Sequence, residues 1–178
     1  LFILNFLTVT YFPYYIYNNG IVWQEPVIFI VGWLLAGMGI TVGYHRYFSH
    51  KTFRTYFIIE WILMFCGTMG LQNKIINWCS DHRTHHKKLD TDEDPYSITK
   101  GFFHAHIGWI LKKDENCRVE NISDLEKKSA IKFQNKFYWP LAIFLSFIFP
   151  LLIGLLYGRP LGGLLWGGVL RVTLVHHF

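Results

Sequence analysis

The chain has 178 residues, of which 52% are hydrophobic and 19% aromatic, and its mean hydropathy is positive. This composition excludes an ordinary soluble domain and favours a membrane protein. The formal net charge is +5, and 15 of the 17 Lys and Arg residues lie between Arg46 and Lys136. Under the positive-inside rule that central segment is expected to face the cytosol.

Four apolar segments are long enough to cross a bilayer, since a span needs about 20 residues at a rise of about 1.5 Å each. They are residues 1–17, 27–44, 138–157 and 161–178. Asn-Asn-Gly at 18–20 separates the first two and Gly-Arg-Pro at 158–160 separates the last two, which predicts two tight helical hairpins. Both ends of the chain lie in apolar runs, so we expect a piece of a longer protein.

A fifth apolar run, residues 56–71, decides the topology. It is shorter than the others and contains Glu60. If it crossed the bilayer, the lysines that follow it would lie outside, against the charge rule. We therefore expect an interfacial helix within a cytosolic segment of residues 45–137. The predicted fold is all-α, a single integral membrane domain over residues 1–178 with four transmembrane helices in two hairpins and a cytosolic helical cap.

Five of the nine histidines form two clusters. His82, His85 and His86 have helical spacings of three and four, so pairs of them can share a face. His85 and His86 point about 100° apart on an α-helix, so the trio can address two centres. His45 and His50 are five residues apart, which fits one α-helical face poorly. They would serve different metals, or the helix would end between them.

The chemistry of these clusters favours metal binding, although a single histidine at a membrane boundary more often caps a helix or packs. Neutral imidazole suits iron, zinc, copper and nickel. Asp81 is the one acid beside the second cluster, which argues against a glutamate-rich di-iron bundle. No HExxH sequence is present, so a zinc-protease helix is not indicated. A histidine-rich membrane metal carrier or sensor stays open at this point.

Three stretches carry a resemblance to a known family: GYHRYFSHKTF (43–53), NWCSDHRTHHKKLDTDEDPYS (77–97) and KGFFHAHIGWIL (100–111). Together they resemble the membrane-bound fatty acid desaturases, in particular the acyl-CoA delta-9 branch, from about Trp33 to the end of the chain. The resemblance implies a di-iron enzyme that uses dioxygen to remove two hydrogens from a saturated C16 to C18 acyl chain, leaving a cis double bond. A lipid hydroxylase of the same superfamily is the nearest alternative, because both reactions begin with hydrogen abstraction.

The resemblance also implies the ligand set. His45 and His86 would bind one iron, and His50, His82 and His85 the other. Further ligands, including an HxxHH box, would follow Phe178, so this chain alone is not expected to hold both irons or turn over. His176 and His177 would precede those ligand positions and pack near the metal cavity. His106 matches a family histidine that supports the site, whereas His104 has no such match.

Substrate residues are expected on the same grounds. Trp33 and Gly37 would close the far end of an acyl channel, although small-residue helix packing is an equal explanation for Gly37. The bend of the channel and the approach of the carrier would be lined by Gln72, Asn73, Trp78 and Asp81. Ser80 stands where animal acyl-CoA enzymes have Arg, which leaves CoA or another acyl carrier open.

Partners and location follow from the charge and the resemblance. No flavin, haem or iron–sulfur motif is visible, so a small reduced electron-carrier protein is expected on a basic surface made by Lys87, Lys88, Lys127 and Lys128. That surface also suits anionic lipid. The lysines at 112 and 113 would meet carrier phosphates or form a solvated edge. No nucleic-acid partner is expected, and the protein is placed in the bacterial inner membrane or the endoplasmic reticulum, with its active site toward the cytosol.

Two further expectations concern single side chains. Cys66, Cys79 and Cys117 fit no CxxC pairing and are expected to be free thiols. Arg171 lies about ten residues into its span, where an ionisable group is costly. Glu60 or a polar network under the cap is its expected partner.

Overall fold

The computed structural model describes residues 1–109 and 122–177, and every regular element within those ranges is helical. This agrees with the all-α prediction. The α-helices are α1 (Phe2–Val9), α2 (Tyr11–Asn19), α3 (Gln24–Met38), α4 (Phe57–Thr68), α5 (Ile75–Lys88), α7 (Ser129–Ile143), α8 (Phe149–Leu156), α9 (Pro160–Leu164) and α10 (Arg171–His177). The π-helical segments are η1 (Gly39–Ser49), η3 (His104–Gly108), η4 (Phe144–Ile148) and η5 (Leu165–Leu170), and η2 (Ile98–Lys100) is a 3₁₀ turn.

Two helices are long and apolar enough to cross a membrane: Gln24–Ser49, with 26 residues, and Ser129–Leu156, with 28. The first contains the span predicted at 27–44, and the second covers the span predicted at 138–157 as far as Leu156. The first continues five residues beyond its predicted end, so His45 lies within the helix. The described parts of the predicted spans 1–17 and 161–178 form shorter helices, which do not meet the same test of length and hydropathy. The run at 56–71 forms α4, a shorter apolar helix of 12 residues.

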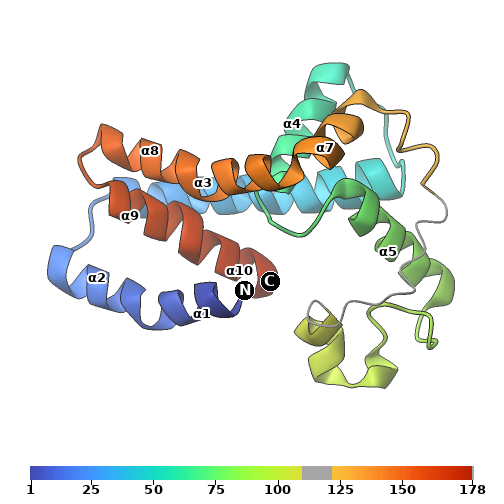
Figure 1. Cartoon of the computed structure of the whole chain (residues 1–178), viewed down its shortest axis with the longest axis horizontal. Helices are drawn as coiled ribbons and strands as arrows, with labels where there is room; N and C mark the ends of the chain where they lie inside the picture. Colours follow the sequence, from blue (N-terminus) through green and yellow to red (C-terminus); the bar gives the residue numbers. More distant parts are fainter. Residues whose placement is uncertain (110–121, 178) are drawn as a thin grey trace.

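Both long helices contact η5, and η1 and α7 meet α4 and α5 at one end of the molecule (Figure 1). At the opposite end, α8 turns into α9, and the run α9–η5–α10 returns across α3. α1 packs against η5 and α10, so the chain's first and last helices are neighbours. The second long helix is broken within α7 at Phe137, three residues before Pro140, because proline lacks an N–H and its ring clashes with the preceding turn.

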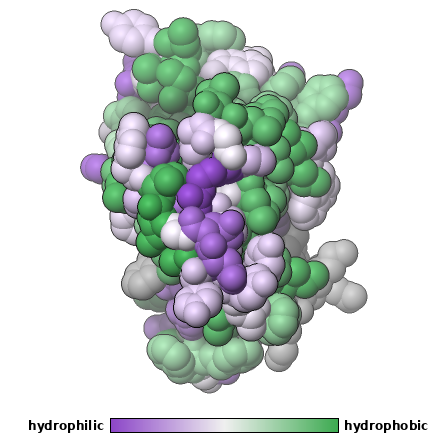
Figure 2. Space-filling model, turned by 90° about the vertical axis from the view of Figure 1, so that its left-hand side faces the viewer, coloured by the Kyte–Doolittle hydropathy of each residue, from purple (hydrophilic) through white to green (hydrophobic). Residues whose placement is uncertain are grey.

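A polar cluster joins the two hairpins at the end far from α5. Glu25 is fully buried, accepts a hydrogen bond from the Tyr15 hydroxyl (3.0 Å) and pairs with Arg159 (3.1 Å). Arg159 also donates to the carbonyls of Asn19 and Gly20 in the turn after α2. Figure 2 views this end and shows polar surface gathered centrally among apolar side chains. The two turns are therefore held together by charge, where packing alone leaves their position loosely defined.

Arg171 is fully buried, and its partners are backbone carbonyls. Its guanidinium donates to Gly167 (2.6 Å), Met69 (2.6 Å) and Ser146 (3.4 Å). Glu60 is not its partner, which corrects that part of the expectation. Glu60 lies at the start of α4 and binds Tyr47 and Lys128, close to the polar end of its helix. The buried arginine therefore joins three helices through the carbonyls at their ends and bends.

Two glycines allow α4 to cross η1 at backbone contact. A Cβ added at Gly39 would lie 2.1 Å from the backbone nitrogen of Gly67, and one at Gly67 would lie 2.2 Å from the Tyr44 ring. Tyr44 and Phe48 then fill the core below the crossing. That core is completed by Met64, Ile75, Cys79, Ile122, Leu125, Ala130 and Ile131. The crossing thus fixes the position of the residues on either side of His45.

We expect Gly39→Ala to destabilise the protein, because the new methyl group meets backbone that cannot move aside. Overpacking of this kind costs about 1 to 3 kcal/mol, which outweighs a gain of up to about 1 kcal/mol in helix propensity. Gly37→Ala is the matched control, since its Cβ has no neighbour within 4 Å. Thermal unfolding in detergent should show a lower midpoint for Gly39→Ala than for Gly37→Ala. Equal midpoints would contradict the close crossing.

Candidate metal centre

The end of η1 brings His45 and His50 together through a π-helical turn. The N–H of His50 donates to the carbonyl of His45 (3.1 Å), and this i to i+5 hydrogen bond defines a π-helical turn, which is wider than an α-helical one. The two imidazole rings lie 4.7 Å apart, centroid to centroid. The five-residue step is therefore awkward only on an α-helix. In this helix it puts both histidines on one side.

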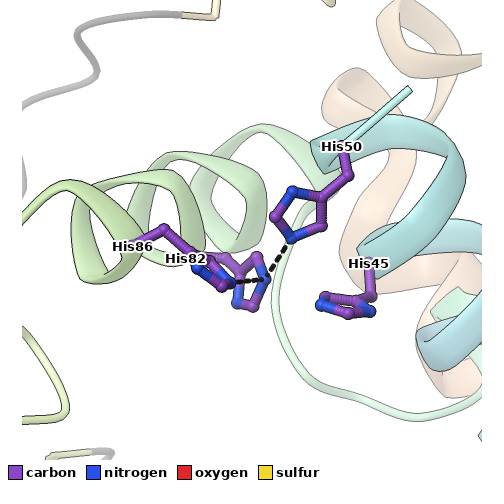
Figure 3. A group of neighbouring side chains, drawn as sticks. All are labelled: His45, His50, His82 and His86. Carbon is purple, nitrogen blue, oxygen red and sulfur yellow. Dashed lines mark hydrogen bonds between the residues drawn. The ribbon is translucent and has the colours of Figure 1, made fainter. Parts of the chain in front are cut away.

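α5 supplies the opposing pair. Lys74 precedes it in an extended conformation, and His82 and His86 lie one α-helical turn apart. The Nε2 atom of His82 is 3.0 Å from Nε2 of His50 and 3.1 Å from Nε2 of His86. Nitrogen atoms of His45, His50, His82 and His86 all lie within 4.8 Å of one another (Figure 3). Four imidazoles from two helices therefore converge on one point, in a group that can hold a metal ion.

His85, the fifth predicted ligand, lies outside this group of four. Its ring centroid is 5.6 Å from that of His86 and 6.3 Å from that of His82. Its Nδ1 atom is 2.8 Å from a carboxylate oxygen of Asp94, which is fully buried. Burial opposes ionisation of Asp94, but hydrogen bonds from His85 and from two backbone N–H groups outweigh it and lower the pKa of that carboxyl. His85 is thus adjacent to the cluster, and the Asp94 carboxylate holds it at its Nδ1 atom.

Most of the predicted substrate residues on the α4–α5 side lie near the histidines. Trp78 stacks on His82, with centroids 4.8 Å apart, and packs edge-on against Tyr44. Its indole N–H donates to Gln72 (3.3 Å), whose amide donates to the carbonyl of Val175. These contacts connect α5 to α10 through Gln72.

The other predicted substrate residues are more scattered. Asn73 has a left-handed backbone (φ 82°), and its N–H donates to the Tyr138 hydroxyl. Asp81 precedes His82 and is partly buried. On α3, Trp33 is 38% exposed, and a Cβ at Gly37 would meet open space. Among the described residues, no contact is found between either of these α3 positions and the histidine cluster.

Arg83 connects the two histidine-bearing helices, a role that the sequence reasoning missed. Its guanidinium donates to the carbonyls of Phe48 (2.8 Å) and Ser49 (3.0 Å) at the end of η1. The same group makes a bidentate pair with Asp124 (2.9 and 3.1 Å), which also pairs with Lys51. Burial opposes ionisation of Asp124, but these two cations lower its pKa. The only signal in the sequence was an arginine between two ligand-type histidines.

Two rings of the cluster resist protonation. Burial, followed by repulsion from His45 and His86, lowers the pKa of His82 to about 3. Burial and the same kind of repulsion lower the pKa of His50. Both rings are therefore unprotonated at pH 7, with a lone pair free for a cation. An all-nitrogen set of imidazole donors fits a divalent transition metal.

The remaining histidines lie elsewhere. His176 donates from Nδ1 to the carbonyl of Val172 (2.8 Å), as a helix-packing residue does. The rings of His106 and His177 stack at 5.9 Å, so His106 contacts α10. His104 bonds the carbonyl of Pro95. None of these four belongs to the group that can hold a metal among the described residues.

Comparison with known proteins identifies the family. Residues 23–178 match the fatty acid desaturase family. The chain belongs to this family. A probable acyl-CoA desaturase of Schizosaccharomyces pombe is 36% identical over 92% of this chain and 35% of its own length. A Delta(9)-fatty-acid desaturase of Caenorhabditis elegans is 39% identical over 74% of this chain and 40% of its own.

The vertebrate relatives agree with the resemblance to the acyl-CoA delta-9 branch. The stearoyl-CoA desaturase of Bos taurus is 37% identical over 68% of this chain and 35% of its own length. The chain thus spans less than half the length of these desaturases. All four histidines of the cluster lie inside the matched region, residues 23–178.

The predicted basic surface of the chain is reduced by ion pairs. Lys88 pairs with the exposed Glu93, and Lys128 pairs with Glu60. Lys87 and Lys127 are exposed. Lys112 and Lys113 lie outside the described residues. Cys66 and Cys79 are free thiols as expected, and Cys117 also lies outside the described residues.

We expect Arg83→Gln to loosen the centre, because the glutamine cannot make the bidentate pair with Asp124 and reach both carbonyls of η1. Loss of these partly buried charged hydrogen bonds should cost about 2 to 3 kcal/mol in stability. Arg46→Gln, an exposed change on η1, is the control. In the metal-free protein, Arg83→Gln should lower both the thermal unfolding midpoint and the affinity for zinc measured by titration. Arg46→Gln should lower neither. Equal zinc affinity in the two variants would contradict the connecting role.

Proposed function

We propose that this chain contributes the first two histidine clusters of a membrane-bound di-iron desaturase. The substrate would be a saturated C16 to C18 acyl chain, carried as its CoA ester, and the product a cis-monounsaturated acyl chain for lipid biosynthesis. The observation that carries the proposal is the convergence of four imidazoles from η1 and α5. It is supported by the names of the relatives, which are acyl-CoA and stearoyl-CoA desaturases.

The residues present fit iron as the metal. His45 and His86 would hold one ion, and His50, His82 and His85 the other. Iron bound there would supply the activation of dioxygen and the removal of two hydrogens from an unactivated methylene pair. The chain's own part is to hold the ligands. Trp78 packs against His82 and Tyr44, which fixes the position of the His82 ring.

For the topology, we propose four spans with the histidine cluster on the cytosolic side. Support comes from the exposed apolar surfaces of the helices, which need a non-aqueous environment. α4 would lie along the interface. Its residues Phe57, Ile58 and Ile62 are exposed, whereas Glu60 is buried against Lys128 and Tyr47, as in a helix with one face in lipid.

The chain would hold its substrate along α3 and in the bend between α4 and α5. Trp33 and Gly37 would face the methyl end of the acyl chain. Gln72, Asn73, Trp78 and Asp81 would line the bend and the approach of the carrier. Electrons would come from a small acidic carrier protein that docks near Lys87 and Lys127, the two exposed lysines of the predicted surface.

The direct test uses the full-length protein in membranes with stearoyl-CoA, dioxygen and a reduced carrier. We expect an oleoyl product from the unaltered protein. His82→Ala should form no product and should bind less iron, by one equivalent or more. His104→Ala, outside the cluster, should retain both. A hydroxylated acid without an alkene would favour the hydroxylase. Metal binding without substrate-dependent oxygen consumption would favour a metal carrier, whose ligands would normally lie near the bilayer midplane.

The position of Gly37 gives a test of the acyl channel. Gly37→Leu should shift the preferred substrate from C18 toward shorter chains, because a larger side chain shortens the space available to the methyl end. The structure has open space at this Cβ, so the fold should tolerate the change. Gly32→Leu is unsuitable as a control because its Cβ would meet Arg171 at 2.9 Å. Leu34→Phe, an exposed position on α3, serves instead. An unchanged C18 to C16 product ratio in Gly37→Leu would exclude Gly37 from the channel.

A further inference from the structure

The sequence LDTDEDPYS, which follows the second histidine cluster, folds back behind His85. Asp94 lies at the centre of this segment and is fully buried. One carboxylate oxygen accepts the N–H of Tyr96 (2.9 Å) and lies 2.8 Å from Nδ1 of His85. The other accepts the N–H of Asp90 (2.9 Å), whose backbone is left-handed (φ 58°). Each carboxylate oxygen therefore has a partner, and the orientation of the carboxylate is fixed.

His85 is held on more than one side by the same segment. Its ring packs against Tyr96 at 5.3 Å, and Tyr96 packs against Trp109 at 4.7 Å. Lys100 donates to the carbonyls of Asp92 and Asp94, closing the segment around the carboxylate. A solvent-exposed loop would need no buried carboxylate. This one places it directly against a ligand-type histidine.

A carboxylate at Nδ1 constrains an imidazole in two ways. It can only accept a hydrogen bond, so the proton of the neutral ring lies on Nδ1 and the lone pair lies on Nε2. It also fixes the ring plane, which reduces the reorganisation needed when a metal binds. By contrast, the Nε2 atom of His82 lies 3.0 Å from that of His50 and 3.1 Å from that of His86.

We propose that Asp94 is a positioning residue for His85 and that it holds the Nε2 atom of that ring ready for a metal ion. This rests on the proposed di-iron function. It gives the segment after the second cluster a purpose, which is to hold His85 ready for the ion that it would share with His50 and His82. Asp94 acts only through His85 and does not itself bind the metal.

The test is a double-mutant cycle in the full-length, iron-loaded protein. Asp94→Asn should weaken the binding of one of the two irons about 10- to 100-fold, measured by competition with a chelator. In a His85→Ala background the same change should have no further effect on iron affinity. Asp92→Asn, an exposed acid two residues earlier, removes the same charge and should leave both irons unaffected. Additive losses in the double variant, or an equal loss in Asp92→Asn, would overturn the proposal.

A measurement on the unaltered protein covers the case in which Asp94→Asn does not fold. Nitrogen-15 NMR of labelled histidines, with the His85 signal assigned by its loss in His85→Ala, should show the proton on Nδ1 in the metal-free and zinc-loaded protein. A proton on Nε2 would overturn the proposal. A wild-type protein that binds only one iron would contradict the di-iron function, while the tautomer of His85 would still test the role of Asp94.

Discussion

The arrangement of the candidate centre depends on the guanidinium of Arg83. It takes the last carbonyls of η1 and the carboxylate of Asp124 as partners, so the helix with His45 and His50 ends against the helix with His82 and His86. Helix C-termini leave carbonyls without partners, and a cation is the natural group to satisfy them. Because the same residue sits between two histidines of α5, satisfying the end of η1 also sets the distance between the two pairs of imidazoles.

The four imidazoles also depend on the surrounding structure to stay close together. Burial, followed by repulsion between the rings, lowers the pKa of His82 and of His50, which opposes their protonation. The lone pairs stay directed at one point only if the rings are held in place by their surroundings. The Gly39–Gly67 crossing, the core around Tyr44 and the stack of Trp78 on His82 supply that support. Such a preformed site needs little reorganisation to accept a cation.

Part of this could be predicted from the sequence. Apolar length identified the two long helices, and the histidine spacing identified the ligand-type residues, because both are local properties of the chain. The geometry around them is not local. The π-helical turn that unites His45 and His50 depends on where η1 ends, and the partners of Arg171 are carbonyls of residues far away in the sequence. A buried acid such as Asp94 looks like any other acid in a polar segment until the fold brings His85 to it.

Three charged side chains inside this apolar protein contact places where a helix ends or bends. Arg171 reaches the carbonyls at the end of α4 and near the bend at η4, whereas Glu25 and Arg159 join the two turns at the opposite end. A transmembrane helix satisfies its own backbone except at such points, so a charge placed elsewhere would lose its hydration without gaining partners. The histidines of η1 also lie at such a point, where that helix ends. In the proposed function, a metal centre built there would be reached from water by a carrier, while an acyl substrate would extend along the helices into the lipid-facing interior.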